Sequence, residues 1–268
     1  MMACSSLLPA GLCAAPIFSA DWATWLALAV MAAGLLVAAF ARGYSGFGFS
    51  ALLVASWSLV APPALPVAVT MLLELSASVM QAVGVWPHVD WRRVALLLIG
   101  AVIGTPFGVA VLGYASPELL RLVIATFLLV CCGALLAGYS LKRKLGAPGD
   151  VAVGAASGLA NGATAMGGLP VALFLAASGV APAVMRATFI AYFFPLDIMT
   201  VSLMARQGLI GWDTLMLALI CLPGLVIGVV LGGRHFLAAS PEQFRRQTLI
   251  LLIGLALIGL VRAMGALL

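Results

Sequence analysis

Long stretches without a charged residue constrain this chain more than any other feature of its sequence. The 20 residues from Trp22 to Ala41 carry no charge, nor do the 31 from Gly43 to Leu73 or the 35 from Val151 to Met185. A helix that crosses the hydrocarbon core of a bilayer needs ~20 such residues. The three runs therefore predict membrane helices, and the two longer runs must each hold more than one segment.

The composition agrees with a membrane protein throughout. Of 268 residues, 65% are hydrophobic and 8% are charged, whereas roughly a quarter of an average soluble domain is charged. This excludes a soluble globular protein, a disordered chain and a disulfide scaffold. At ~20 residues per span, the length allows about eight to ten membrane segments and no sizeable soluble domain. We predict an all-α polytopic membrane protein in a lipid bilayer.

The sequence lacks the motifs of the common enzyme and cofactor classes. It has no HExxH, no GxSxG and no Walker Gly-Lys pair, so we expect no enzyme, cofactor or ATP-driven pump. The five cysteines lie at 4, 13, 131, 132 and 221, without the spacing of a metal site. The net charge of +5 comes with one basic run, at 142–144, which is too little for a nucleic-acid partner.

Charged loops and clusters of glycine and proline divide the chain into segments. Residues 1–20 are interpreted as a lead-in. We expect membrane segments near 22–41, 47–60, 66–85, 94–114, 118–141, 151–162, 168–179, 184–205, 213–233 and 243–266.

The chain also repeats itself. The tripeptide Ser-Pro-Glu at 116–118 recurs at 240–242, an offset of 124, and the glycines at 100, 104 and 108 recur at 224, 228 and 232. Matches at one fixed offset indicate an internal repeat, with a first unit at 21–145 and a second at 146–268. The glycines themselves are interpreted as sites of close helix packing.

The charge pattern predicts that the two repeats are inverted. If the loop at 142–144 is cytoplasmic, counting spans places ten of the 13 basic residues on that side. Each half then has an odd number of crossings, and both termini lie in the periplasm. Inverted repeats with broken, re-entrant helices are an architecture of secondary transporters.

Two glycine-rich interruptions, at 42–50 and 161–170, are the first candidates for a binding site. Unwound backbone inside a membrane must be buried in protein or line a cavity. The half-helix after each interruption would aim its positive N-terminal end at that cavity and attract a small anion. The alternative is that the glycines only allow helices to cross closely. The candidates are Ser45, Gly46, Phe47, Gly48, Ser50, Asn161, Thr164, Gly167 and Gly168.

Two acids lie within predicted spans, Glu74 and Asp197. A charged group in hydrocarbon costs at least ~2.5 kcal/mol, so we propose both as proton-coupling residues. The alternative is a hydrogen-bonded acid that never titrates. Arg42 and Arg186 are candidates for residues that attract an anion to the entrance of the site. The alternative is that they only mark the cytoplasmic face of the membrane.

Several short segments occur along the chain in a characteristic order and spacing. They are Arg42-Gly43 with Gly46–Phe49, Leu72–Glu74, His88–Arg92, Gly104–Gly108, Gly158–Pro170, Arg186–Thr188 with Tyr192-Phe193, and Gly232–Arg234. In this order and spacing they resemble the sulfite exporter TauE/SafE family, also called the TSUP transporters. The resemblance implies a bacterial inner-membrane carrier of small sulfur-containing anions such as sulfite, sulfoacetate or another sulfonate, and it adds Tyr192 to the candidate substrate-binding residues.

Together these features predict a proton-coupled exporter that works by alternating access around a site at mid-membrane. A small-anion uniporter or channel driven by the membrane potential is the alternative, and a non-transporting membrane scaffold is a third hypothesis. The partners would be the anion, protons and lipid. A homodimer is compatible with the apolar surface, although no residue specifies one.

Overall fold

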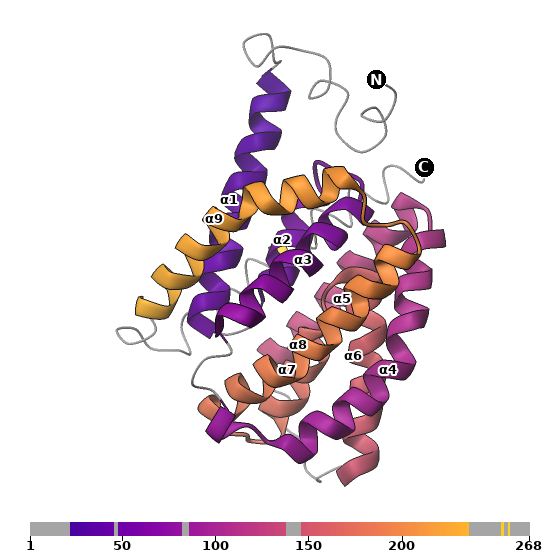
Figure 1. Cartoon of the computed structure of the whole chain (residues 1–268), viewed down its shortest axis with the longest axis vertical. Helices are drawn as coiled ribbons and strands as arrows, with labels where there is room; N and C mark the ends of the chain where they lie inside the picture. The colour runs from indigo at the N-terminus through magenta and orange to yellow at the C-terminus, as the bar shows by residue number, and fades with distance from the viewer. Residues whose placement is uncertain are drawn as a thin grey trace.

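The structure is a computed structural model that describes residues 22–45, 48–81, 86–137, 146–235, 253–254 and 257. Within these ranges the regular elements are helices (Figure 1). They are α1 (Trp22–Ser45), α2 (Phe49–Trp57), α3 (Ala64–Gln81), the short 3-10 helix η2 (Trp86–His88), α4 (Trp91–Tyr114), α5 (Pro117–Leu136), α6 (Gly146–Thr164), α7 (Gly168–Ala177), α8 (Pro182–Arg206) and α9 (Trp212–His235).

Six of the described helices are long and apolar enough to cross a membrane. Their candidate spans are Thr24–Gly43, Ala64–Gln81, Trp91–Tyr114, Pro117–Leu136, Val184–Arg206 and Trp212–Arg234. The prediction of an all-helical polytopic membrane protein is therefore confirmed by the helical elements and by the six candidate spans. The lead-in at 1–20 and most of the segment expected at 243–266 lie outside the described residues.

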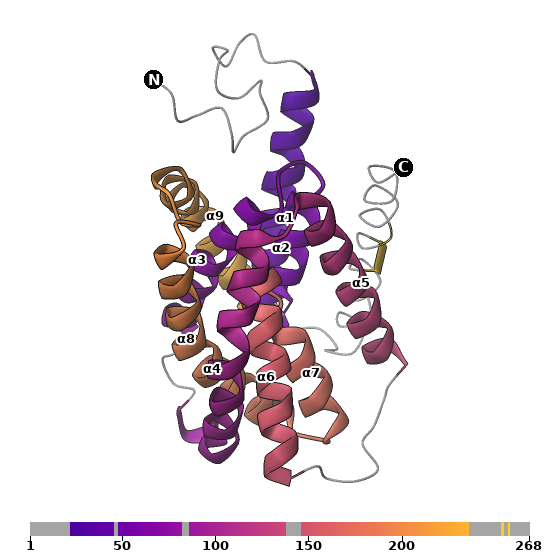
Figure 2. The same ribbon diagram turned by 90° about the vertical axis from the view of Figure 1, so that its right-hand side faces the viewer.

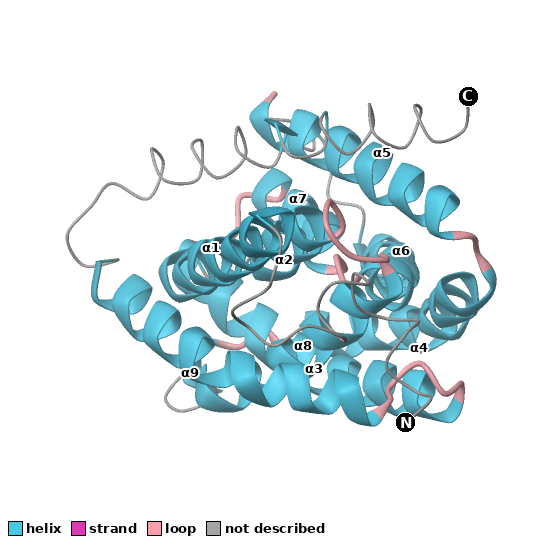
Figure 3. Ribbon diagram, turned by 90° about the horizontal axis from the view of Figure 1, so that it is seen from above, coloured by secondary structure: helices cyan, strands magenta, loops and turns pink. Residues whose placement is uncertain are grey.

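The chain leaves helical geometry at both predicted glycine-rich interruptions. α1 ends at Ser45, and α2 begins after Gly48, whose φ of 87° lies in the left-handed region that glycine adopts without strain. α6 ends at Thr164, and Ala165 follows with a φ of 60°, which is uncommon for a residue with a Cβ. The helices that follow, α2 and α7, have nine and ten residues. Both are too short to span a bilayer, and they lie inside a ring of longer helices (Figure 3).

Glycines bring two pairs of helices into close contact. α4 and α6 run side by side (Figure 2), and a Cβ added at Gly158 of α6 would lie 2.5 Å from the carbonyl oxygen of Ala101 in α4. α9 crosses α1 in the same manner, with Gly228 against Ala39. The interpretation of the repeated glycines as packing positions therefore holds for the described helices.

One tryptophan ties α2 to α1. Trp57 is 1% exposed, and its indole Nε1–H donates a hydrogen bond of 2.9 Å to the carbonyl of Met31. Buried tryptophan needs such a partner, so this contact fixes the position of the short helix against the long one.

Charged residues join the beginnings of α4 and α6. Asp90 caps α4 by accepting a hydrogen bond from the backbone N–H of Arg93. The Nε of Arg93 lies 3.3 Å from Oδ1 of Asp150 in α6, and its guanidinium lies 5.7 Å from the ring centroid of Phe174 in α7. Arg93 thus holds three helices together at this end of the molecule.

Candidate functional site

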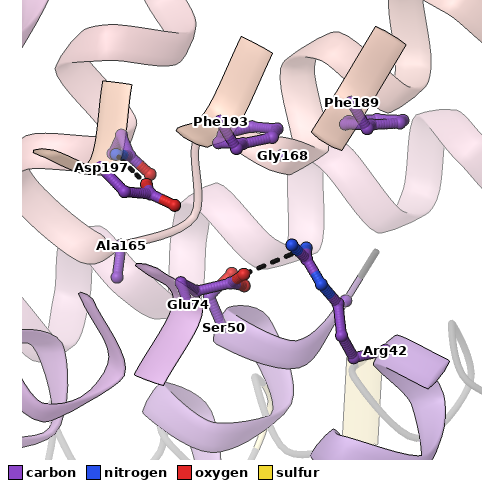
Figure 4. Close-up of a pocket in the computed structure, with 10 residues that line it drawn as sticks. Arg42, Ser50, Glu74, Ala165, Gly168, Phe189, Phe193 and Asp197 are labelled. Atoms are coloured by element: carbon purple, nitrogen blue, oxygen red, sulfur yellow. Dashed lines mark hydrogen bonds and ion pairs between the residues drawn. The ribbon is translucent and has the colours of Figure 1, made fainter. Parts of the chain in front are cut away.

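A small polar cavity lies where the two interruptions meet α3 and α8 (Figure 4). Its volume is about 10 Å³, roughly the space that one water molecule requires. An oxyanion of sulfur has at least four non-hydrogen atoms, so the cavity must widen to hold one. The lining residues are Arg42, Gly48, Ser50, Glu74, Asn161, Ala165, Gly168, Phe189, Phe193 and Asp197.

The cavity contains a buried ion pair. Arg42, in the last turn of α1, places Nη1 3.0 Å from Oε2 of Glu74 in α3, and the two side chains are 4% and 8% exposed. Nη2 of Arg42 donates a hydrogen bond of 3.3 Å to Ser78, one turn after Glu74. Among the described residues, none donates a well-aligned hydrogen bond to Oε2 of Glu74. The attraction between the opposite charges therefore holds the pair together. Removing one partner would leave an uncompensated charge inside the protein.

The second acid lies across the cavity, beside the end of α6. Nδ2 of Asn161 donates to Oδ1 of Asp197 at 3.3 Å and to the hydroxyl of Thr200 at 3.2 Å. Asp197 is 1% exposed, and its Oδ2 has no hydrogen-bond partner among the described residues. α8 is continuous through Pro195, so Asp197 borders the interruption between α6 and α7 and not a break in its own helix. A buried polar atom in this state calls for a ligand, water or proton.

Two aromatic rings cover one side of the cavity. Phe189 and Phe193 of α8 stack with their centroids 5.7 Å apart, and they lie above Arg42 and Glu74 in Figure 4. Neither ring was among the site residues predicted from the sequence, and Ala165 was not among them either. The sequence does contain a signal for the two rings. Phe189, Phe193 and Asp197 are spaced four residues apart, so both rings share a helix face with a predicted site residue.

Each short helix begins at the cavity. Gly48 precedes α2 and Ser50 lies in its first turn, while Gly168 is the first residue of α7, and all three line the cavity. The N-cap residue of α2, Gly48, has no side chain with which to cap the helix. The unpaired N–H groups and positive end of such a helix favour a negative charge.

The predicted site residues separate into three groups. Arg42, Gly48, Ser50, Glu74, Asn161, Gly168 and Asp197 line the cavity, while Thr164, Gly167, Tyr192 and Arg186 do not. The side chain of Ser45, and Gly46 and Phe47 entirely, lie outside the described residues.

Three of the predicted residues have positions that differ from expectation. Arg42 is 3% exposed and faces the cavity interior, because α1 continues to Ser45 instead of ending at the arginine. Tyr192 is buried behind the wall, where its hydroxyl donates to Ser157 at 2.9 Å. Thr164 turns away too, since its hydroxyl donates to the Ala160 carbonyl of its own helix.

The cavity therefore combines one guanidinium and two helix N-termini, which supply positive potential, with two buried carboxyl groups and two aromatic rings. In the described part of the chain, His, Cys, Asp and Glu side chains form no cluster of three or more that would hold a metal ion.

Comparison with known proteins identifies relatives of this chain. The family model "Sulfite exporter TauE/SafE" matches residues 9–258. A protein of Cupriavidus necator described as "Probable sulfite/organosulfonate exporter TauE" is 30% identical over 217 residues, which cover 79% of this chain and 85% of the relative. No solved structure shows a significant match. The chain therefore belongs to the TauE/SafE family of sulfite exporters and is a multi-pass membrane transporter, not an enzyme.

Proposed function

We propose that this protein is a proton-coupled secondary transporter in the bacterial inner membrane that exports a small sulfur-containing anion, such as sulfite, sulfoacetate or another sulfonate. The observation that carries the proposal is the cavity at the two helix interruptions, where buried Arg42 faces Glu74 and Asp197. The name of the Cupriavidus relative supports the same class of substrate.

The anion would sit between Arg42 and the N-termini of α2 and α7. Ser50 and the backbone N–H groups after Gly48 and Gly168 would donate hydrogen bonds to its oxygens. Asn161 would orient Asp197 beside it. Thr164, Gly167 and Tyr192 would support the cavity wall, and Arg186, which shares the face of α8 with Phe189, would attract anions toward the cavity.

Two inverted repeats, 21–145 and 146–268, would move around this site. The order of the described helices supports the repeat, because a helix, a short helix and two long helices follow one another in α1–α4 and again in α6–α9. The packing supports it as well, since α4 of the first unit contacts α6 and α9 of the second contacts α1. Rocking of one unit against the other would open the cavity to each side in turn, with both termini in the periplasm.

The proposal is tested with purified protein in liposomes. Labelled sulfite and sulfoacetate are supplied with and without an imposed pH gradient, and counterflow is measured for each. Gradient-dependent accumulation with counterflow supports a proton-coupled carrier. Flux that follows only the electrochemical gradient of the anion, without counterflow, indicates a uniporter or channel. No flux of either anion contradicts the proposed substrate class.

A cavity-filling variant links the flux to this site. An added Cβ at Gly168 would lie 3.8 Å from the ring of Phe193, which is ordinary contact, so Gly168→Val should fold while its methyl groups fill the space. We expect transport to be lost. Gly133→Val in α5, where no described residue lies within 4 Å of the added Cβ, is the matched control and should transport normally. Normal transport by Gly168→Val would move the site elsewhere.

A further inference from the structure

We propose that Glu74 is the internal counter-ion of the anion site, and that a substrate anion takes its place on Arg42 only together with one proton. This inference rests on the proposed function and deepens it. It assigns Arg42 as the residue that binds the anion directly, and it specifies that anion and proton bind together and not in alternation.

Among the described residues, the lining of the cavity contains a single cation. Arg42 is the one Lys or Arg side chain among the described residues that line it, and Glu74 contacts its guanidinium at 3.0 Å. An anion that enters the cavity therefore meets a guanidinium already paired with a carboxylate. Because the contact with Oε2 is not a well-aligned hydrogen bond, an oxyanion with better geometry can compete for the same nitrogen.

Besides Arg42, the described groups that face Glu74 include a second acid. From α8 it faces Asp197, another acid, and on its own helix Ser78 follows one turn later. Arg186 lies on the same side of α8 but outside the lining. α2 has no ionisable side chain. The ionisable residues of α9, none of which lines the cavity, are Asp213, Cys221, Arg234 and His235.

A displaced Glu74 carboxylate thus has no second cation in the described lining to receive it. A buried charge without a partner is strongly unfavourable, and a carboxyl avoids this state by taking a proton. The exchange is balanced: the Arg42–Glu74 pair, one proton and one monovalent anion give an Arg42–anion pair and a neutral Glu74 carboxyl. The net charge of the cavity does not change.

The exchange also specifies the direction of coupling. A monovalent sulfonate and its proton would cross the membrane together without net charge. Export would then be driven by accumulation of the anion inside the cell and slowed by an acidic exterior, and it would not respond to the membrane potential.

The test uses ethanesulfonate, a strong acid that stays ionised between about pH 5 and pH 8, where carboxyl groups in proteins can titrate. Binding to the purified full-length protein is measured across this range, and proton uptake is followed with a pH-sensitive dye in weakly buffered solution. We expect one proton taken up per anion bound, and an affinity that rises up to tenfold for each pH unit lowered.

Two variants locate the proton. Glu74→Gln has the shape of the protonated acid, so it should bind ethanesulfonate with an affinity independent of pH and take up no proton. Glu118→Gln, at the start of α5 and outside the cavity, should behave as wild type. If Glu74→Gln does not fold, the proton uptake of the wild-type protein still decides whether the anion and the proton bind together.

Binding without proton uptake, binding with proton release, or uptake that persists in Glu74→Gln would each overturn the exchange while leaving the transporter proposal in place. Failure of the wild-type protein to bind ethanesulfonate at any pH would overturn the organosulfonate site and the exchange with it. The first group of results is thus distinguishable from a failure of the proposed function.

Discussion

Replacing Gly158 by alanine should separate α4 from α6 and destabilise the protein. The added Cβ would lie 2.5 Å from the carbonyl oxygen of Ala101, 2.8 Å from the Cα of the same residue and 2.8 Å from Oγ1 of Thr105. Two of these three atoms belong to the backbone of α4. They cannot rotate away as a flexible side chain can, so the helices must move apart and lose contacts along the interface.

The magnitude follows from two opposing contributions. Overpacking a close interface costs ~1–3 kcal/mol, and backbone contacts at these distances place Gly158 near the upper limit. Alanine in a helix interior gains ~0.5–1 kcal/mol over glycine. We therefore expect a net loss of about 2 kcal/mol in the free energy of unfolding for Gly158→Ala.

Gly133→Ala is the matched control, because it makes the same chemical change at a position in α5 with no described residue within 4 Å of the added Cβ. It should gain ~0.5–1 kcal/mol. Both variants are unfolded reversibly in mixed micelles, and helix content is followed by circular dichroism. A Gly158→Ala protein at least as stable as Gly133→Ala would refute the close contact between α4 and α6.

Three further predictions use the same unfolding assay. Arg42→Met should lose ~3–5 kcal/mol because it leaves Glu74 buried without its counter-ion; the double variant with Glu74→Gln should recover most of this loss, and equal instability of the single and double variants would contradict the ion pair. Trp57→Phe should lose ~1–3 kcal/mol because the carbonyl of Met31 loses its hydrogen bond, and an unchanged unfolding midpoint would argue against that contact. Ala165→Gly should gain about 1 kcal/mol by relieving the left-handed conformation of alanine, whereas a destabilised variant would mean that residue 165 has a different backbone conformation.

The expectation of a mid-membrane site came from residues that are unusual in an apolar sequence. Glycine-rich stretches that interrupt hydrophobic runs predicted the breaks after α1 and α6, and isolated acids within spans identified Glu74 and Asp197. These inferences are local, because few residue types are compatible with an unwound backbone or a charge in hydrocarbon. The structure places both acids and both breaks at one cavity.

The pairing of Arg42 with Glu74 was not predictable, nor was the orientation of Tyr192. The spacing of Phe189, Phe193 and Asp197 indicated a shared helix face, but not that this face meets the cavity. Arg42 was expected at the end of a span because charges commonly mark span ends. Its burial depends on α3, which supplies the partner that makes a charge tolerable there. Likewise, Phe189 and Phe193 are apolar residues of a kind found throughout the chain, and the packing of α8 is what places them at the cavity.

The sequence by itself determined that the chain is helical and crosses a membrane, where its helices break, and which few polar residues lie within the apolar segments. Hydrophobicity and chain length decide these properties one segment at a time. Only the tertiary structure decided which side chains meet. Residues facing lipid and residues facing the interior are both apolar in a membrane protein, so hydropathy does not distinguish them, and contacts between distant helices depend on the close packing of the whole molecule.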